Sequence, residues 1–585
     1  MSSDPFSAPV FDAVLTHDGG QPCGMVSASS PMLADLDGDG SLEIVVGTLR
    51  NTSTDGGYAA CLAVLNSNGS IRWSHVMIGS INSTPAVGDI NGDGKPDIVV
   101  GLGAENEPPT PGGVVAFDRN GNQLWYYQTA DRIGNSGNPN GLPDGVWASP
   151  AIVDVNNDGQ KQIVVGAWDG KIHLINGSNG TAFAAPGNNL WPAEMLDTIW
   201  SSPAIADLNS DGRPDFIFGG DTSANGPACT SDGGLLRVMY NQPGVGPTHL
   251  PGFNTQYGCL AGTGSVFNIA HYGLSVDQSL YSSPVVGDFG SRGKLIIIGS
   301  GCAFPIGTNC DRNGSGKWVK IWDRNGNLVA TLPTDAPIFG SPALADINGD
   351  GVPDIIVGTM GRGWIDGTGA GGTLYAWSGA PGFPLLWARK PGNFVNLTSV
   401  LISSSPSIAD LNGDGQPEIL VGYAGEIEVF DHNGNQLTEH NGTVEPSVPT
   451  LWLGRSPVNN SPAVGDLDQS GTLKIVGAGS FCDPTTGVCD GMGRVRAWSA
   501  SALGLLNPAP AGRAPTAKLP WPMFRREPTH QAFATTRAAF APIAPAALNL
   551  SSLLGSNIPL NANITLTNVS PVGANYTVNY STRVS

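Results

Sequence analysis

The sequence predicts an all-β protein: an eight-bladed β-propeller, with a seven-bladed ring as the alternative, followed by part of an immunoglobulin-like β-sandwich. Two observations predict this fold class. A motif of Ser or Thr, Pro, a short apolar run and an acidic loop recurs eight times, and long internal repeats indicate propellers, solenoids or arrays. Most repeats also contain four short runs of β-forming residues, and four antiparallel strands repeated radially form a propeller.

The first repeat shows the elements in order. A short apolar run follows Ser30-Pro31, acidic residues alternate along a tight turn to Gly40, and a β-branched run ends at Gly47. A third run of alternating character and a fourth, more variable run follow in most repeats. They are joined by turns such as Asp118-Arg-Asn-Gly121. Asn-Gly between apolar runs is a strong hairpin signal, so each repeat predicts one four-stranded sheet.

The repeats are spaced unevenly. The aspartate that begins each acidic loop stands four residues after the proline, and successive aspartates are separated by 53 to 81 residues. We therefore expect long insertions in some loops. The eight aspartates are Asp35, Asp89, Asp154, Asp207, Asp288, Asp346, Asp410 and Asp466.

Six of the acidic loops have the composition of a calcium site. They place oxygen donors at positions 1, 3, 5 and 9, with a backbone carbonyl available at position 7, and Ca²⁺ prefers such hard oxygen ligands. An EF-hand is excluded because Val46 stands where position 12 would carry glutamate and because the flanks read as strands. Calcium is therefore the expected cofactor. The expected ligands are Asp35, Asp37, Asp39, Ser41, Glu43, Asp89, Asn91, Asp93, Lys95, Asp97, Asp154, Asn156, Asp158, Gln160, Asp207, Asn209, Asp211, Arg213, Asp215, Asp346, Asn348, Asp350, Val352, Asp354, Asp410, Asn412, Asp414, Gln416 and Glu418.

Three loops depart from this pattern. The third carries Gln162 at position 9, so its calcium should bind more weakly. The loops that begin at Asp288 and Asp466 are one residue shorter and have lost most of their acids. We expect these two to hold no ion, with Arg292 or Lys474 supplying the positive charge internally.

The ring needs a strand from the N-terminal end to close. The last repeat has a clear third strand but then turns proline-rich, and Val10–Leu15 precedes the first motif where a fourth strand would sit. We predict that this strand completes the last blade and removes an open edge, with Trp521–Phe524 capping the seam. The predicted organisation is a propeller over 1–530, an Ala/Pro-rich linker over 531–547 and a partial sandwich over 548–585.

The C-terminal piece is too short for a whole sandwich. An immunoglobulin-like domain needs about seven strands over about 100 residues, whereas 548–585 offers three or four. Either the native chain continues beyond Ser585 or a neighbouring molecule completes the sheet. The second option would make the protein a fibre subunit.

The eight cysteines predict disulfides rather than zinc, since no C-x₂-C spacing occurs. Disulfides indicate an oxidising compartment, so we expect an extracellular protein, secreted or at the cell surface. The expected pairs are Cys23 with Cys61, Cys229 with Cys259, Cys302 with Cys310, and Cys482 with Cys489.

Composition excludes several function classes. The net charge of -20 argues against nucleic-acid binding and against anionic membranes. No run of 18 or more apolar residues exists, so no membrane insertion is expected. The sequence also lacks H-x₃-H, HExxH, GxSxG and Walker-type motifs. No catalytic residues are therefore predicted, and we expect Trp73, Trp125, Trp318, Trp322, Trp387 and Trp498 to pack between blades.

The stretches from Asp89 to Gly101 and from Asp346 to Gly358 follow the pattern Asp-x-Asn-x-Asp-Gly-x-Pro-Asp, with a run such as Ile-Val-Val-Gly after it. This pattern resembles the FG-GAP repeat of integrin-α-like propellers and their bacterial relatives, and the resemblance covers about residues 10–500. It implies calcium at the loops, blades around a central channel and an extracellular setting. It implies less about activity, since one fold hosts many functions.

Two functional hypotheses from different classes follow. The first is a secreted, calcium-stabilised scaffold, adhesin or fibre subunit whose partner is a glycan or an extracellular protein, with self-assembly through the C-terminal sandwich as a further option. The second is a carbohydrate-active enzyme such as a calcium-dependent polysaccharide lyase. A lyase needs a base and charge-neutralising cations in a cleft, and only 28 Lys and Arg residues are spread along the chain. The chain is therefore expected to be a binding protein rather than an enzyme.

Overall fold

The structure is a computed structural model that describes most of the chain as far as residue 534. The described residues are 8–50, 57–103, 110–131, 141–183, 191–195, 198–221, 234–242, 246–253, 256–257, 271–272, 274–276, 280–300, 316–360, 371–390, 402, 404–423, 425–438, 451–453, 460–482, 489–500, 522–527 and 529–534. They form β-sheets and short 3-10 turns. The prediction of an all-β fold is confirmed.

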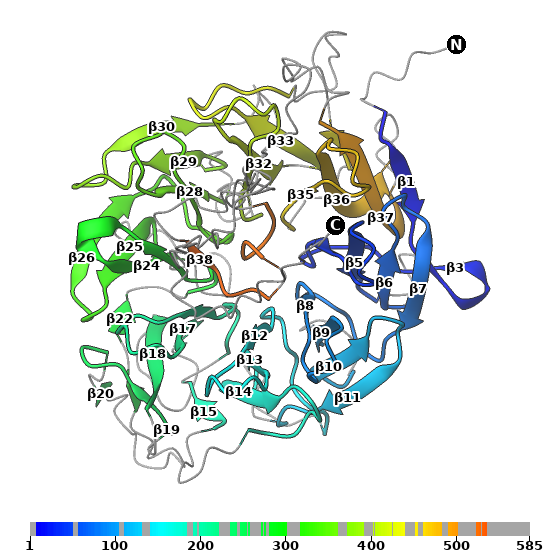
Figure 1. The fold of residues 1–585 in the computed structure, drawn as a ribbon, viewed down its shortest axis with the longest axis horizontal. Helices are drawn as coiled ribbons and strands as arrows, with labels where there is room; N and C mark the ends of the chain where they lie inside the picture. The colour runs from blue at the N-terminus through cyan, green and yellow to red at the C-terminus, as the bar shows by residue number, and fades with distance from the viewer. Residues whose placement is uncertain are drawn as a thin grey trace, which may run out of the picture.

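Eight four-stranded antiparallel blades surround a central channel, as Figure 1 shows. From the channel outward, blades one to four are β4 (Met32–Ala34), β5 (Glu43–Gly47), β6 (Cys61–Leu65) and β7 (Ile71–Val76); β8 (Ala86–Gly88), β9 (Asp97–Leu102), β10 (Gly113–Asp118) and β11 (Gln123–Tyr127); β12 (Ala151–Val153), β13 (Gln162–Gly166), β14 (Lys171–Asn176) and β15 (Ala193–Glu194); and β16 (Ala204–Ala206), β17 (Asp215–Asp221), β18 (Gly234–Gln242) and β19 (Gly246–His249). Blades five to eight are β23 (Val285–Asp288), β24 (Lys294–Gly299), β25 (Trp318–Asp323) and β26 (Leu328–Pro333); β27 (Ala343–Ala345), β28 (Asp354–Gly358), β29 (Leu374–Trp377) and β30 (Leu385–Arg389); β31 (Ser407–Ala409), β32 (Glu418–Tyr423), β33 (Glu426–Phe430) and β34 (Leu451–Trp452); and β35 (Ala463–Gly465), β36 (Lys474–Cys482), β37 (Cys489–Ser499) and β1 (Phe11–Val14).

A few short strands lie outside this plan. β22 (Leu274–Val276) adds to blade four beside β18, and β38 (Phe533–Ala534) adds to blade five beside β23. The remaining short strands pair as two ribbons, β2 (Thr16–His17) with β3 (Gln21–Pro22) and β20 (Gln256–Tyr257) with β21 (His271–Tyr272).

The N-terminal strand closes the ring. β1 pairs antiparallel with β37, with Phe11 opposite Ala497 and Val14 opposite Arg494, at the outer edge of blade eight (Figure 1). The Asp12 carboxylate accepts a hydrogen bond from the Arg496 guanidinium at 2.7 Å across this pair. The predicted closure is confirmed, and so are the eight blades, which excludes the seven-bladed alternative.

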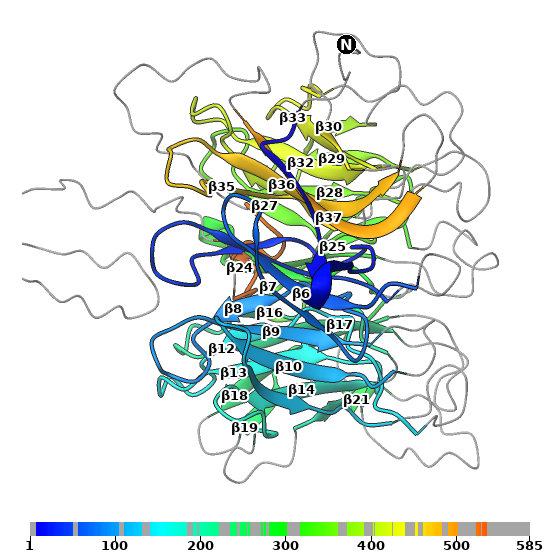
Figure 2. The same cartoon turned by 90° about the vertical axis from the view of Figure 1, so that its right-hand side faces the viewer.

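The ring has two different faces because the strands run between them (Figure 2). In each blade the innermost strand runs from the Ser/Thr-Pro motif to the acidic loop, and the second strand returns. The acidic loops and the turns between third and fourth strands therefore lie at one face, which we call the acidic-loop face. The Ser/Thr-Pro motifs and the connections between second and third strands lie at the other, which we call the motif face.

A closed ring of hydrogen bonds joins the blades at the Ser/Thr-Pro motifs. The backbone N–H of the residue before each proline donates to the side-chain hydroxyl of the corresponding residue in the next blade, over 2.8–3.1 Å. All eight residues are buried. In order they are Ser30, Thr84, Ser149, Ser202, Ser283, Ser341, Ser405 and Ser461, and the last donates to the first. The motif recurs because each copy offers a donor to one neighbour and an acceptor to the other.

The apolar core lies within and between adjacent blades, and the glycine that ends the second strand makes room for it. A Cβ atom on Gly47 would lie 2.1 Å from the Ile81 side chain of the next blade, and one on Gly358 would lie 2.2 Å from Ile402. Both isoleucines are fully buried, and each stands four residues before the proline of its own motif. The final glycine of each Ile-Val-Val-Gly run is thus a packing residue between blades.

Tryptophans on the outer strands bind the next blade, which confirms the predicted inter-blade role for three of them. Each indole N–H donates to a carbonyl in the turn of the neighbouring blade: Trp73 to Arg119 at 3.0 Å, Trp125 to Gly177 at 2.6 Å and Trp387 to His432 at 2.9 Å. On the closing strand, Phe11 packs against Gly69 of blade one. β1 therefore replaces an ordinary fourth strand in its packing as well as in its pairing.

Residues 522–534, which we call the channel segment, lie inside the ring (Figure 1). Backbone N–H groups of the innermost strands donate to the segment's carbonyls: Val464 to Pro522, Ile152 to Thr529, Ile205 to Gln531 and Val286 to Ala532. The prediction that Trp521–Phe524 caps the outer seam is therefore wrong for the described Pro522–Phe524. The segment also includes the first four residues of the predicted linker.

Charged and polar side chains fix the channel segment. The fully buried Arg525 guanidinium donates to the carbonyl of Pro284 at 2.6 Å and to that of Pro203. His530 is also fully buried, and its Nδ1 lies 2.9 Å from the Pro150 carbonyl. These three prolines belong to the motifs of blades three, four and five, so the segment binds several blades at once.

Several sequence predictions fall wholly or partly outside the described residues. The sandwich over 548–585 is one, and so are Cys229, Cys259, Cys302 and Cys310. Cys23 and Cys61 form the predicted disulfide. The backbones of Cys482 and Cys489 face each other in register across β36 and β37, and the disulfide between them stays a prediction. Among the described residues, no helix has the length and apolarity to cross a membrane.

Candidate metal centre

The six acidic loops share one pattern of internal hydrogen bonds. The aspartate at position 1 accepts the N–H of the position 6 glycine through one carboxylate oxygen, as in Asp35 with Gly40 at 2.9 Å. The aspartate at position 5 accepts the N–H of position 7 in all six, as in Asp39 with Ser41 at 2.6 Å. Each carboxylate thus uses one oxygen to hold the turn, which leaves oxygen capacity for another partner.

The side chain at position 9 is buried beneath each loop. In every one of the six it accepts the N–H of position 2: Glu43 from Leu36, Asp97 from Ile90, Gln162 from Val155, Asp215 from Leu208, Asp354 from Ile347 and Glu418 from Leu411. The predicted ligand at position 9 is therefore also a structural acceptor. Gln162 makes the same bond through its amide oxygen at 2.9 Å, which explains why a neutral side chain is tolerated in the third loop.

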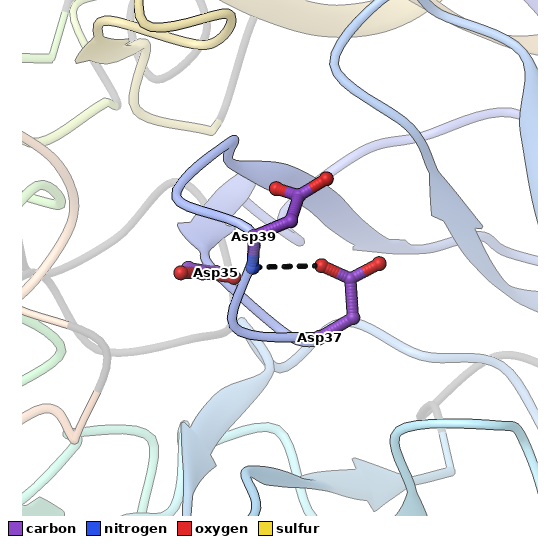
Figure 3. A group of neighbouring side chains, drawn as sticks. All are labelled: Asp35, Asp37 and Asp39. Atoms are coloured by element: carbon purple, nitrogen blue, oxygen red, sulfur yellow. Dashed lines mark hydrogen bonds between the residues drawn. The ribbon is translucent and has the colours of Figure 1, made fainter.

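The first loop brings three carboxylates together. Asp35, Asp37 and Asp39 can each place one oxygen within 4.8 Å of the others, and all three project from one tight turn (Figure 3). The Asp39 N–H donates to Asp37 Oδ1 at 3.3 Å, which is the dashed line in Figure 3. The Arg72 guanidinium from β7 lies 2.7 Å from Asp37 Oδ2 and lowers the pKa of that carboxyl. A cation in this loop would share Asp37 with Arg72.

The other five loops carry asparagine at position 3 in place of aspartate. These residues are Asn91, Asn156, Asn209, Asn348 and Asn412. An amide oxygen is a neutral ligand that Ca²⁺ accepts, so these loops offer less charge but the same donor type. At position 7 the side chains of Ser41, Lys95, Gln160, Arg213, Val352 and Gln416 have nothing in common, which fits a position that contributes only its backbone.

Some carboxylate oxygens in these loops lack a partner among the described residues. Asp215 Oδ1 and Asp410 Oδ1 are buried and receive no hydrogen bond. A buried carboxylate without a donor or cation is costly. The residues present therefore fit a bound cation, because an ion at the loop would satisfy these oxygens.

Burial raises the pKa of the position 9 acids. The pKa is about 6 for Asp97, about 7 for Asp215 and Asp354, and about 8 for Glu418. Loss of hydration is the main cause in each, and the neighbouring aspartates of the same loop add to it. A nearby divalent cation would remove both penalties and keep these groups ionised.

The loop of blade eight replaces the cation with a lysine. Lys474 begins β36 in the register that Glu43 has in β5. Its ammonium lies 3.1 Å from Asp468 Oδ1, 3.2 Å from Ser470 Oγ and 3.1 Å from the Thr472 carbonyl. The hydrogen bond from Ser470 and the ammonium hold the pKa of Asp468 at about 2. The internal charge predicted for this loop is confirmed.

Arg292 does not serve the loop of blade five in that way. It lies over the rings of Phe289 and Phe383, with its guanidinium carbon 5.2 Å and 4.8 Å from their centroids, and donates to the Gly379 carbonyl of blade six. The prediction for Arg292 is therefore wrong, because the side chain packs between blades. Lys294, at the start of β24, instead donates to the Asp207 carbonyl of blade four.

One titratable chain stands apart from the loops. His173 Nε2 lies 2.9 Å from Asp169 Oδ2, and the Tyr127 hydroxyl lies 2.9 Å from His173 Nδ1. Tyr127 belongs to blade two and the other two residues to blade three. Burial and the Asp169 charge raise the pKa of Tyr127, which suits a hydrogen-bonded link between blades. Sequence analysis missed this group because the blades that supply it are paired only in the fold.

Fold and loops together define an eight-bladed β-propeller with acidic loops at one face. The repeats are FG-GAP repeats: residues 35–100, 154–218 and 410–477 match the FG-GAP-like repeat, and residues 339–377 match the FG-GAP repeat. The family resemblance inferred from the motifs is confirmed. No curated protein sequence matches the chain significantly.

Three solved structures illustrate the likeness of fold. BamB from Moraxella catarrhalis is 11% identical with a TM-score of 0.41, and the match covers 84% of this chain and 97% of that one. A rhamnogalacturonan lyase from Bacillus licheniformis is 13% identical with a TM-score of 0.36, covering 90% and 81%. The V. cholerae biofilm matrix protein Bap1 is 14% identical with a TM-score of 0.35, covering 85% and 91%. At these values the likenesses carry no functional argument.

Proposed function

We propose that this chain is an extracellular, calcium-stabilised β-propeller that works as a binding scaffold, as an adhesin or fibre subunit does. Its partner in this proposal is a glycan or an extracellular protein. The observation that carries the proposal is the shared construction of the six acidic loops. Their carboxylates hold the turn with one oxygen and leave others without partners, as at Asp215 and Asp410.

Calcium is the ion that these donors suit. Carboxylate, amide and carbonyl oxygens in a flexible loop match the ligand preference of Ca²⁺. The ion would be held by the side chains at positions 1, 3, 5 and 9 and by the carbonyl at position 7. It would supply positive charge where the net charge of the chain is -20. The ions would therefore stabilise the ring and would have no part in chemistry.

An extracellular setting is supported by the cysteines. Cys23 and Cys61 are joined by a disulfide that links the N-terminal region to β6 of blade one. Disulfides persist in oxidising compartments and are rare in the cytosol. Self-assembly through the predicted C-terminal sandwich remains part of the proposal and would be measured as the mass of the full chain in solution.

The test of the calcium proposal is removal of the metal. A ligand that binds only the folded state at 100 times its Kd adds about 2.7 kcal/mol per site. We expect excess chelator to lower the melting temperature and added Ca²⁺ to restore it, with bound metal counted by elemental analysis. An unchanged melt in protein shown to be metal-free would contradict the proposal.

Two substitutions give a matched control. Asp350→Ala removes the position 5 carboxylate of the blade six loop and should cost one bound ion. Ser470→Ala changes the corresponding region of the blade eight loop, where Lys474 already supplies the charge, and should cost none. Equal metal content in the two variants would show that the loops do not bind as proposed.

A calcium-dependent polysaccharide lyase is the competing proposal. Tyr127, with His173 and Asp169 behind it, is one described group that could act as a base. Its raised pKa makes the tyrosinate rarer at neutral pH, which disfavours this role. Release of unsaturated products from acidic polysaccharides, lost in Tyr127→Phe, would establish the enzyme and overturn the scaffold.

A further inference from the structure

Five aromatic residues form a continuous row on the motif face, and we call them the aromatic arc. They are Trp147, Trp168, Trp200, Tyr281 and Phe339. Four of them occupy one equivalent position, three residues before the motif proline, in blades three to six. Trp168 lies in the short turn between β13 and β14 of blade three. The arc therefore crosses four adjacent blades on the face opposite the acidic loops.

The rings contact one another in sequence. Ring centroids are 5.0 Å apart for Trp147 and Trp200, 4.8 Å for Trp168 and Trp200, 5.3 Å for Trp200 and Tyr281, and 5.1 Å for Tyr281 and Phe339. Trp147 and Trp168 are stacked at 5.7 Å. Such contacts make each ring a firm neighbour of the next, so the arc is one aromatic surface rather than five separate side chains.

Blade packing does not require these rings. The inter-blade core is filled by the residue one position earlier, such as Val146, Ile199 and Ile338, each fully buried. In the other four blades the aromatic position is taken by Ala28, Asn82, Ser403 and Asn459. Small and polar residues thus serve the fold equally well at this position.

The rings are also partly open to solvent. Trp147, Trp168, Trp200 and Phe339 are half-buried, while Tyr281 is buried. The Trp168 indole N–H is buried and has no acceptor among the described residues. Aromatic walls with a few polar groups are typical of small-molecule and cofactor sites. An arc on one half of a face, with nothing aromatic at the same position on the other half, fits a ligand better than it fits packing.

We propose that the aromatic arc binds a neutral glycan chain, a specific ligand for the scaffold proposed above, on which this inference rests. A sugar ring has an apolar C–H face that packs on an aromatic ring and hydroxyl edges that stay hydrated. A row of rings across four blades suits an extended chain of sugars. The net charge of -20 opposes polyanionic glycans, so the expected chain is uncharged.

The test uses the full chain in native gels that contain a soluble neutral polysaccharide. Laminarin, galactomannan, xyloglucan and dextran are the neutral probes, with polygalacturonate as the charged comparison. We expect at least one neutral probe to retard the protein. Trp147→Asn and Trp200→Asn, which copy the Asn82 of blade two, should each weaken retardation about tenfold. Leu385→Asn, which removes a 54% exposed side chain on β30, should not.

The outcomes separate the two proposals. Failure of all four neutral probes, or equal retardation of the wild type and the tryptophan variants, would overturn the glycan site while calcium-dependent melting could still hold. Loss of retardation together with a lower melting temperature in both variants would assign the arc to packing. Retardation by polygalacturonate alone, or arc-dependent binding of a basic protein without any glycan, would also overturn it.

Discussion

At the scale of single residues, the Ser or Thr before each proline holds its blade to both neighbours. Its N–H donates forward and its hydroxyl accepts from behind, and the side chain is buried in all eight blades. Removing the hydroxyl would leave a buried amide of the preceding blade without an acceptor. An unsatisfied buried donor costs more than the hydrogen bond itself contributes.

We predict that Ser202→Ala lowers the free energy of unfolding by about 1–3 kcal/mol, because the Ser149 N–H loses its acceptor. Ser202→Thr should be close to neutral, since Thr84 fills the same role in blade two. Urea unfolding of both variants measures this. A neutral Ser202→Ala would mean that water or another group replaces the hydroxyl.

The sequence could show that this residue recurs but not why. Its partner lies in another repeat, 53 to 81 residues away in most blades, and nothing local marks that contact. The acids at positions 1, 3 and 5 were easier, because their spacing alone implies a turn rich in oxygen donors. The position 9 residue was predicted only as a ligand, and its hydrogen bond to the position 2 amide appears only in the fold.

At the scale of the element, two loops solve the same electrostatic problem in different ways. Six loops concentrate acids that await a cation, whereas the loop of blade eight contains its own ammonium from Lys474. The substitution is possible because the first residue of the second strand, where position 9 falls, is buried under the turn. A long basic side chain there reaches Asp468 and Ser470.

Lys474→Met should lower the free energy of unfolding by roughly 1 kcal/mol in chelator-treated protein, because Asp468 loses its cation. The effect should depend on pH with a definite sign. The pKa of Asp468 is depressed in the fold to about 2, so its contribution is present above the ordinary value near 3.8 and is lost as pH falls toward 2. Urea unfolding at pH 7 and at pH 3 should show the difference between variant and wild type shrinking. A constant difference would assign the lysine a packing role.

Elements were the scale at which the sequence predicted best. Each blade needs four strands, so the missing fourth strand of blade eight pointed to Val10–Leu15, and β1 confirms it. Arg292 was misassigned because sequence spacing matched it to its own loop, while its length carries it to the rings of Phe289 and Phe383.

At the scale of the whole molecule, the channel segment binds blades three, four, five and eight at their inner strands. It was not foreseen because it has no periodic pattern, and its hydrogen bonds go to strands that the sequence places hundreds of residues earlier. Two ionisable groups secure it. Burial lowers the pKa of Arg525 to about 9 and that of His530 to about 3.

His530 makes acid sensitivity testable. The neutral ring fits the fold, because its Nε2 is buried without a partner among the described residues. The unfolded chain would bind a proton below about pH 6.5 that the folded chain refuses until about pH 3. Stability from this group is therefore full above 6.5 and falls by about 1.4 kcal/mol per pH unit below it.

His530→Asn keeps a donor for the Pro150 carbonyl and cannot titrate. We expect its unfolding free energy to depend less steeply on pH between 6 and 4 than that of the wild type, by up to one proton. Comparison with the wild type cancels the titration of His249 and of the loop acids. Parallel pH profiles would show that His530 is not excluded from protonation as the fold implies.

The hydrogen-bond ring has a consequence for how such a molecule can grow over generations. Every repeat carries one donor for the blade ahead and one acceptor for the blade behind, so any repeat is a compatible neighbour for any other. Duplication or loss of a whole repeat would leave no orphan group at this ring, whatever the final number. Divergence is then free to act elsewhere, as it has where one blade carries tryptophan and another asparagine at the same position.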